Sequence, residues 1–224
     1  MARFFGVVTL AAALAGSPAA AQKQVYEPLP PPGSAYVRFV NGLGRNVTLK
    51  PDFLPPQPLG TAVDQRVTSY YVVEKVAGRS LTLEAQDNGD RVTLRVEPGS
   101  FVTVIVQQST GQTVRAVVLV DHTDFNQSRA RLAFYNATPA CDAAKLSLVP
   151  DGSTVFQDVA PGTVKTRSVN PVVAQVRATC DGQATPPFPL QNLEAGGMYS
   201  IWLMMPAGSP AAFVTRDTTA PWKP

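Results

Sequence analysis

Alternation of apolar and polar side chains dominates this chain and restricts its possible folds more than any other feature. A period of two places successive side chains on opposite faces of a β-strand. The alternating segments are Ala35–Asn41, Arg79–Ala85, Arg91–Val96, Phe101–Gln107, Arg131–Asn136, Lys145–Val149, Val172–Thr179 and Met198–Met205. No convincing helix of ten residues follows residue 21. We therefore predict an all-β fold of antiparallel sandwiches, immunoglobulin-like or jelly-roll-like, in which each sheet keeps one face in water.

The two halves of the chain resemble each other. The segment AYVRFVNGLGRNVTL (35–49) and the segment ARLAFYNATPACDAAKLSL (130–148) both give an alternating strand, an asparagine, a short loop and a second strand. Similarity at a spacing of about ninety-five residues indicates duplication of a whole domain. We expect an N-terminal sandwich at 35–122, a C-terminal sandwich at 129–216 and a tail at 217–224. The polar seam at 121–129 favours hinge freedom between the sandwiches.

The N-terminus has the pattern of a secretory signal. Arg3 precedes an apolar run, and the small residues Ala19 and Ala21 are placed for cleavage before Gln22. That run is too short to span a bilayer, and nothing later reaches about eighteen apolar residues. We predict a signal peptide at 1–21, export to the periplasm and no transmembrane segment in the mature chain. The proline-rich leader at 22–34 favours extended chain, either as a stiff tether or as an arm that meets a partner.

The chain has two cysteines, Cys141 and Cys180, both in the second half. In an oxidising compartment an even count favours a disulfide. Closing a loop of about forty residues would stabilise the fold by roughly 3–4 kcal/mol. The alternative is a pair of separate buried thiols.

Catalytic residues are scarce. The single histidine, His122, lies in the seam, and a serine triad could use it with Asp121 or Asp124. However, the chain has no Gly-x-Ser-x-Gly elbow and no Gly-Asp-Ser, and Leu119 stands where related esterases place an aspartate. We therefore interpret His122 as a solvated linker residue and predict that the protein is not an enzyme.

Ligand and cofactor signals are similarly weak. One histidine and two cysteines cannot supply the usual zinc ligands, and Asp87–Asp90 fits a hairpin turn better than a calcium site. We predict no metal and no cofactor. The net charge of +3 comes without a basic cluster, which argues against a nucleic-acid partner. Tyr70 and Tyr71 are adjacent, so one would face outward on a strand, and Trp222 lies in the tail; these aromatics are candidate ligand or partner contacts.

Two blocks of the sequence resemble a known family. The block VYEPLPPPGSAYVRFVNG (25–42) resembles the start of mature proteins of the AlgF family of alginate O-acetylation. The block QDVAPGTVKTRSVNPVVAQV (157–176) is similar to the family's second domain through its Val-Ala-Pro and Asn-Pro-Val. The chain departs from the family in its insert PDFLPPQPLG (51–60) and in its cysteine pair.

The resemblance implies a periplasmic protein of two β-sandwich domains, required for O-acetylation of a secreted polysaccharide such as alginate or cellulose. Such proteins are adaptors between a membrane-bound O-acyltransferase and periplasmic acetyltransferases, and the resemblance supplies no catalytic residues. The alternative function is a carbohydrate-binding module that holds the polymer on an exposed aromatic. A third reading is an esterase-like enzyme that uses His122.

Overall fold

The computed structural model describes residues 29–85, 91–108, 114–123, 125–190, 192–206 and 208–222. The predicted signal peptide, leader residues 22–28 and the Asp87–Asp90 turn lie outside these ranges. The described part of the chain is almost entirely β-structure, and its single helix is α1 (Val63–Arg66). The all-β prediction is confirmed.

The strands divide into two sets of similar composition. The first set is β1 (Ala35–Asn41), β2 (Val47–Pro51), β3 (Gln57–Leu59), β4 (Tyr71–Val73), β5 (Ser80–Ala85), β6 (Arg91–Arg95), β7 (Phe101–Gln108) and β8 (Val114–Asp121). The second set is β9 (Ala130–Asn136), β10 (Ala144–Val149), β11 (Thr154–Val159), β12 (Val164–Val169), β13 (Ala174–Cys180), β14 (Gln183–Ala184), β15 (Phe188–Leu190), β16 (Met198–Met204) and β17 (Ala211–Arg216).

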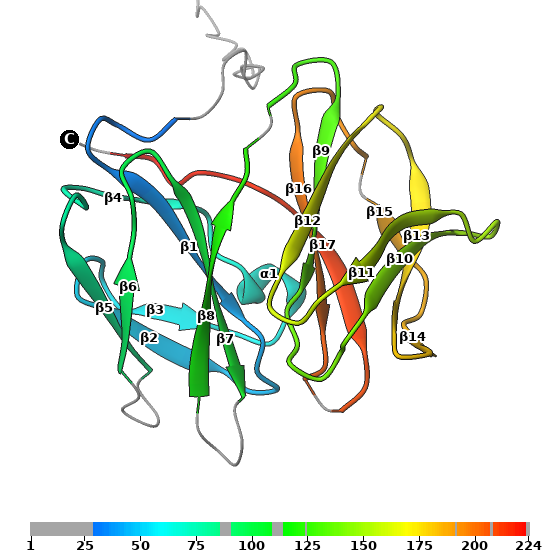
Figure 1. The fold of residues 1–224 in the computed structure, drawn as a ribbon, viewed down its shortest axis with the longest axis horizontal. Coiled ribbons are helices and arrows are strands. Elements are labelled where there is room, and N and C mark those ends of the chain that lie inside the picture. The colour runs from blue at the N-terminus through cyan, green and yellow to red at the C-terminus, as the bar shows by residue number, and fades with distance from the viewer. Residues whose placement is uncertain are drawn as a thin grey trace, which may run out of the picture.

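Each set forms a two-sheet sandwich around its own apolar core. In the N-terminal sandwich, the sheet β4-β1-β7-β8 packs on the sheet β3-β2-β5-β6. In the C-terminal sandwich, β12-β9-β16-β17 packs on β11-β10-β13-β14, with β15 also paired to β13. Figure 1 shows the two sandwiches side by side, with the blue-to-green half next to the green-to-red half.

The ladders are antiparallel except for one parallel pair in each sandwich. β1 pairs with β7 in parallel, and β9 pairs with β16 in parallel, at equivalent places in the two sheet orders. Alternation along a strand does not encode the direction of its neighbour, so the sequence could not predict these pairs. Their common position supports the duplication of the two halves.

The asparagine that ends the first strand of each repeat has the same task in both sandwiches. Asn41 donates from Nδ2 to the carbonyl oxygens of Arg45 and Gly60, at 2.9 and 2.8 Å. Asn136 donates to the carbonyl oxygens of Cys141 and Val159, at 2.7 and 2.9 Å. Both side chains are fully buried. Each therefore satisfies loop carbonyls where the chain leaves one sheet for the other.

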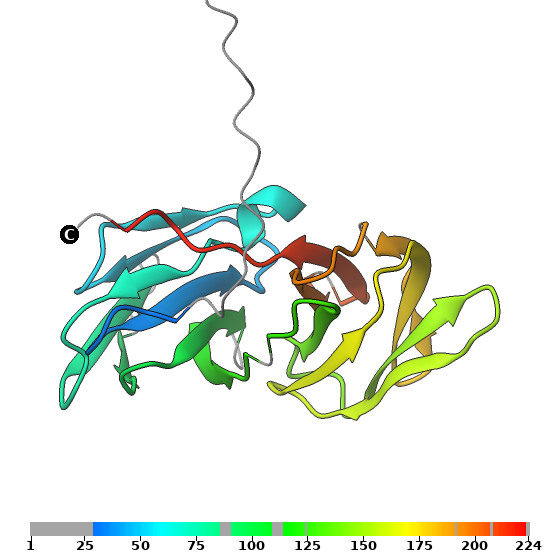
Figure 2. The ribbon, with the colours of Figure 1, turned by 90° about the horizontal axis from the view of Figure 1, so that it is seen from above.

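The expectation of one wet face per sheet is wrong for the two sheets at the centre. Every residue of β1 and of β9 is buried. The outward faces of these sheets pack against each other in a shared apolar cluster that includes Val40, Ile105 and Trp202. Because the sandwiches meet through whole sheet faces, the seam at 121–129 does not leave them separated by a hinge (Figure 2).

Candidate functional site

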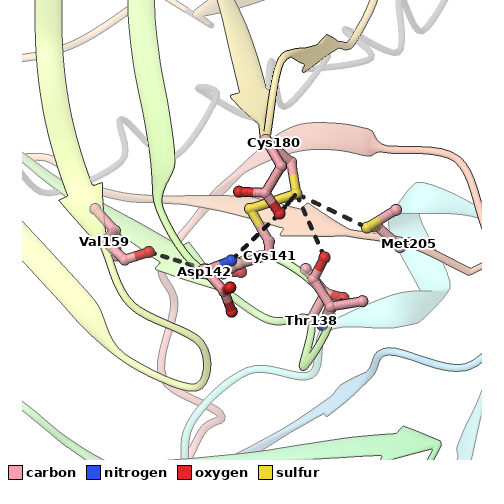
Figure 3. The surroundings of a disulfide bond; sticks show 9 residues. Thr138, Cys141, Asp142, Val159, Cys180 and Met205 are labelled. Carbon is pink, nitrogen blue, oxygen red and sulfur yellow. Dashed lines mark hydrogen bonds between the residues drawn. A yellow bond between two sulfur atoms is a disulfide. The ribbon is translucent and has the colours of Figure 1, made fainter.

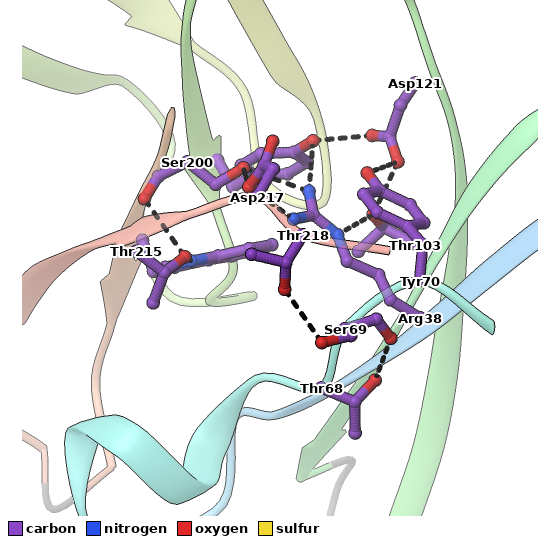
Figure 4. A network of polar contacts seen from close by, with 12 residues as sticks. Arg38, Thr68, Ser69, Tyr70, Thr103, Asp121, Ser200, Thr215, Asp217 and Thr218 are labelled. Carbon is purple, nitrogen blue, oxygen red and sulfur yellow. Dashed lines mark hydrogen bonds and ion pairs between the residues drawn. The ribbon is translucent and has the colours of Figure 1, made fainter. Parts of the chain in front are cut away.

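A hydrogen-bonded polar constellation lies inside this sheet-to-sheet contact. We call it the interdomain network; its members are Arg38, Tyr70, Thr103, Asp121, Tyr135, Ser200 and Asp217. Figure 4 shows Arg38 between Asp217 and Asp121. Arg38 and Thr103 come from β1 and β7, whereas Tyr135 and Ser200 come from β9 and β16. The two parallel strand pairs therefore bring side chains of both sandwiches to one place.

Arg38 is the centre of the network. Its Nε donates to Thr103 Oγ1 at 2.8 Å, and its Nη1 donates to Asp217 Oδ1 at 2.7 Å. Its Nη2 donates to Tyr135 Oη at 2.8 Å and to Ser200 Oγ at 3.0 Å. The side chain is 1% exposed. Three of its four hydrogen bonds cross from the N-terminal to the C-terminal sandwich, so one guanidinium joins the two domains.

The Asp121 carboxylate accepts hydrogen bonds from three hydroxyl groups of the network. Tyr135 Oη donates to Asp121 Oδ1 at 2.6 Å. Thr103 Oγ1 and Tyr70 Oη donate to Asp121 Oδ2 at 2.6 and 2.8 Å. Thr103 and Tyr135 thus accept from the guanidinium and donate to the carboxylate. Such charge-assisted hydrogen bonds are shorter and stronger than those between neutral groups.

Asp217 also lies near a second buried arginine of the interface, Arg131, but contacts it less closely than Arg38. Its carboxylate accepts from Arg38 and from Ser200 Oγ, the latter at 2.7 Å. Arg131 Nη1 lies 3.7 Å from Asp217 Oδ2, and both side chains are almost fully buried. The Nε and Nη2 atoms of Arg131 are buried without a hydrogen-bond partner. Arg131 is therefore a poorly bonded counterpart of Arg38 at the same interface.

Burial and neighbouring charges fix the protonation of Arg38, Tyr70 and Tyr135. Burial alone would lower the pKa of Arg38, but the negative charge of Asp217 and its neighbours outweighs this effect and raises the pKa well above its usual value. Burial, assisted by the charge of Asp121, raises the pKa values of Tyr70 and Tyr135 despite the opposing charge of Arg38. The arginine therefore stays charged and the tyrosines stay neutral at ordinary pH.

Aromatic rings enclose the guanidinium. The Arg38 Cζ atom lies 4.4 Å from the ring centre of Tyr70, 4.8 Å from that of Trp202 and 5.4 Å from that of Tyr135. Tyr135 and Trp202 stack with ring centres 4.2 Å apart. Cation–π contacts gain strength when water is excluded. The rings therefore offset part of the cost of burying the charge.

The C-terminal tail also joins the sandwiches. After β17 the chain returns to the N-terminal sandwich, where Tyr70 N donates to Thr218 O and Ala220 N donates to Tyr70 O, both at 2.8 Å. Trp222 Nε1 donates to Glu74 Oε1 at 3.0 Å. In Figure 1 this red segment crosses to the side of β4. The described part of the tail, up to Trp222, is therefore held along the N-terminal sandwich, where Thr219 forms an isolated parallel bridge with Tyr70.

The candidate aromatics occupy different environments. Tyr70 is 3% exposed and belongs to the interdomain network, so the interpretation of Tyr70 as a surface contact is wrong. Tyr71 is half-buried and packs against the N-terminal core. Trp222 remains 46% exposed and keeps the surface that a stacking contact requires. His122 is exposed, next to the buried Asp121.

The two cysteines form the predicted disulfide. Cys141 precedes β10, Cys180 ends β13, and their Cα atoms are 5.4 Å apart (Figure 3). Both residues are buried, and the Met205 sulfur lies 3.9 Å from Cys180 Sγ. The bridge fixes the loop after Asn136 to the neighbouring strand. A disulfide of this kind is typical of an oxidising compartment.

Arg38 and Asp217 carry no sequence motif that would mark them as site residues, and Asp121 was expected in a polar seam. On the alternating strand β1, Arg38 has the pattern of a solvent-facing residue. The neighbouring strands nevertheless indicate that this face is buried. Ile105 in β7 and Trp202 in β16 are large apolar residues on the face that alternation assigns to water. The network lies inside the protein, so its evident chemistry is to fix the relative position of the two sandwiches.

These features define a class: a two-domain all-β protein whose sandwiches share a buried polar and aromatic interface. No family model matches the chain, and no curated protein matches it. One solved structure found by comparison is "a putative cell adhesion protein from Bacteroides ovatus ATCC 8483", with 11% identity and a TM-score of 0.29 over 86% of this chain and 99% of that one. A similarity this low carries no argument about function. None of the described helices is long and apolar enough to cross a membrane.

Proposed function

We propose that the protein is a non-catalytic periplasmic adaptor required for O-acetylation of a secreted polysaccharide, alginate or a similar polymer such as cellulose. In this role it links a membrane-bound O-acyltransferase to periplasmic acetyltransferases. The observation that carries the proposal is the resemblance of residues 25–42 and 157–176 to the AlgF family. The predicted signal peptide and the disulfide are consistent with an exported protein.

The positions of the two blocks support an adaptor. The first block contains β1, and with it Arg38 at the centre of the interdomain network. The second block contains β12, whose Val164 packs into the apolar cluster between the sandwiches. The resemblance therefore includes residues that hold the two domains together. A fixed two-domain body suits a protein that must keep two partners at a constant separation.

Deletion of the gene tests the proposal. Polymer from the deletion strain should lack acetyl esters while its yield persists, and the wild-type gene should restore the esters. Complementation with His122→Ala separates the adaptor from the enzyme, because an adaptor should restore acetylation fully. Unchanged acetate in the deletion strain would refute the proposal. Lost acetylation with the His122→Ala protein at normal abundance would instead favour catalysis.

The exposed ring of Trp222 favours one alternative, a carbohydrate-binding module that holds the polymer. Calorimetric titration with acetylated and deacetylated oligosaccharides distinguishes the two functions. A binding module requires saturable heat that Trp222→Ala removes. A flat titration would leave the adaptor as the better description.

A further inference from the structure

The edge strand β8 has an open side. β8 pairs regularly with β7 along eight residues and is the last strand of its sheet. Among the described residues, no strand pairs with its other side. An unpaired edge presents a row of backbone donors and acceptors that can pair with another strand.

The centre of β8 has none of the usual protection against such pairing. Natural edges are blocked by charged residues, prolines, bulges or short length. The charges of β8 lie at its two ends, Arg115 and Asp121, and the five residues between them are the uncharged AVVLV. The Asp121 carboxylate is occupied in the interdomain network.

The other sheet edges differ from β8 in charge, regularity, length or exposed apolar surface. β12 has Lys165 and Arg167 inside the strand. β6 and β17 carry arginines only at their ends, as β8 carries its charges, but neither strand has an exposed large apolar side chain. β11 has a register irregularity, and the remaining edge strands have two or three residues. Among the edge strands of the described sheets, β8 is therefore the one whose regular, uncharged centre exposes large apolar side chains.

Two valines on β8 remain exposed at this edge. Val118 is 37% exposed and Val120 is 59% exposed. They pair with Val104 and Val102 of β7, whose side chains belong to the N-terminal core. The opposite face of β8 is not free, because Val117 and Leu119 pack against the C-terminal sandwich. The exposed apolar surface thus continues the N-terminal core at its open side.

The duplicated half of the protein provides an internal comparison. β17 stands beside β16 as β8 stands beside β7, and the asparagines that end β1 and β9 align the two registers. Under this alignment Val118 corresponds to Val214, and Val120 corresponds to Arg216. Val214 is 6% exposed, and Arg216 forms an ion pair with Glu194 at 2.8 Å. The C-terminal sandwich therefore has a covered valine and a charge where the N-terminal sandwich has two exposed valines.

We propose that β8 pairs antiparallel with β8 of a second copy of this chain. In a register centred on Val118, Val118 faces its own copy, Val117 faces Leu119, and Ala116 faces Val120. Every facing pair in this run is apolar and no like charges meet, so the strand is complementary to itself. The pairing would join two sheets β4-β1-β7-β8 into one continuous sheet and cover the exposed valines. This inference does not rest on the adaptor role proposed above.

Analytical ultracentrifugation of the purified full-length mature protein over a concentration series tests the pairing. The wild type should be a dimer at high concentration. Val120→Arg introduces the arginine that the C-terminal sandwich has at the corresponding position. The dimer contains two copies of this residue, and a loss of about tenfold in affinity for each would raise the dissociation constant about a hundredfold. Val173→Arg is the matched control, because Val173 is an exposed valine elsewhere on the surface and its variant should dimerise normally.

Cross-linking tests the register. Val118→Cys should form a disulfide-linked dimer under mild oxidation, because residue 118 meets itself across the two-fold axis, whereas Leu119→Cys should not. A wild type that stays monomeric, or a dimer that Val120→Arg leaves intact, would overturn the proposal. A monomer whose β8 amides become protected from hydrogen exchange only when a foreign chain is added would assign the edge to that chain and would also overturn it.

Discussion

Arg38→Met should destabilise the protein severely, because it leaves the buried Asp217 carboxylate without its closest cation and removes the positive charge near Asp121. Breaking a buried ion pair by removing one member costs about 3–5 kcal/mol. Arg38 makes four hydrogen bonds and three ring contacts, so we expect a loss of about 4 kcal/mol from the unfolding free energy. For a chain of this size each kcal/mol lowers Tm by about 2–4 °C, which gives about 8–16 °C in total.

Differential scanning calorimetry measures both the size and the nature of this loss. The wild type should unfold in one transition, because the interface couples the two sandwiches. Arg38→Met should lower Tm and separate the transition into two, one for each sandwich. A double-mutant cycle with Asp217→Asn would isolate the coupling of the ion pair, since the two residues are in direct contact.

Arg131→Met is the matched control. It removes the same type of side chain from the same interface, next to the same carboxylate. Because two of its nitrogens are buried without a hydrogen-bond partner, its removal should cost only about 1 kcal/mol. Equal losses for the two variants, or a loss below about 1 kcal/mol for Arg38→Met, would refute the reasoning that these contacts couple the domains.

Three further predictions concern stability. Burial raises the pKa values of Tyr70 and Tyr135, so the stability that their neutral forms contribute is fully present below about pH 10 and is lost above it. Alkaline denaturation should show this decline in stability, and the decline should be shallower for Tyr70→Phe. Truncation after Asp217 removes the backbone hydrogen bonds to Tyr70 and the Trp222–Glu74 contact, and it should lower the free energy of unfolding in urea by about 2 kcal/mol. An unchanged urea midpoint would show that the tail does not stay bound to the N-terminal sandwich in solution. Replacing both Cys141 and Cys180 with alanine should cost about 3–4 kcal/mol; equal stability of the oxidised wild type and this variant would contradict that value.

The sequence predicted the strands that alternate and the similarity of the halves, because both depend on local pattern. It did not predict β8, although AVVLV has high strand propensity, because a run that is apolar at every position does not alternate. It also did not predict the interdomain network. Whether Arg38 faces water or the other sandwich depends on Tyr135, Ser200 and Asp217, which lie 97, 162 and 179 positions away, and a linear pattern does not encode their meeting.

Continuous apolar runs were nevertheless informative. β7 (FVTVIVQQ) and β16 (MYSIWLM) each place large side chains on both faces, which is typical of a strand buried on both sides. Since the sequence predicted two tandem sandwiches, the second buried face had to belong to a contact between them. Comparing apolar residues on the outward face of each strand would therefore have predicted docked domains in place of a polar hinge.

The duplication explains why this docking joins unlike halves. Counting back from the asparagines at 41 and 136, Arg38 corresponds to Ala133, and Val40 corresponds to Tyr135. A large side chain in one repeat therefore has a small counterpart in the other, on faces that pack together. Two identical N-terminal faces would bring two copies of Arg38 together without Tyr135, Ser200 or Asp217 to accept their hydrogen bonds. Divergence at these outward positions makes each sandwich complementary to the other half of its own chain, which leaves strand edges such as β8 for contact between copies.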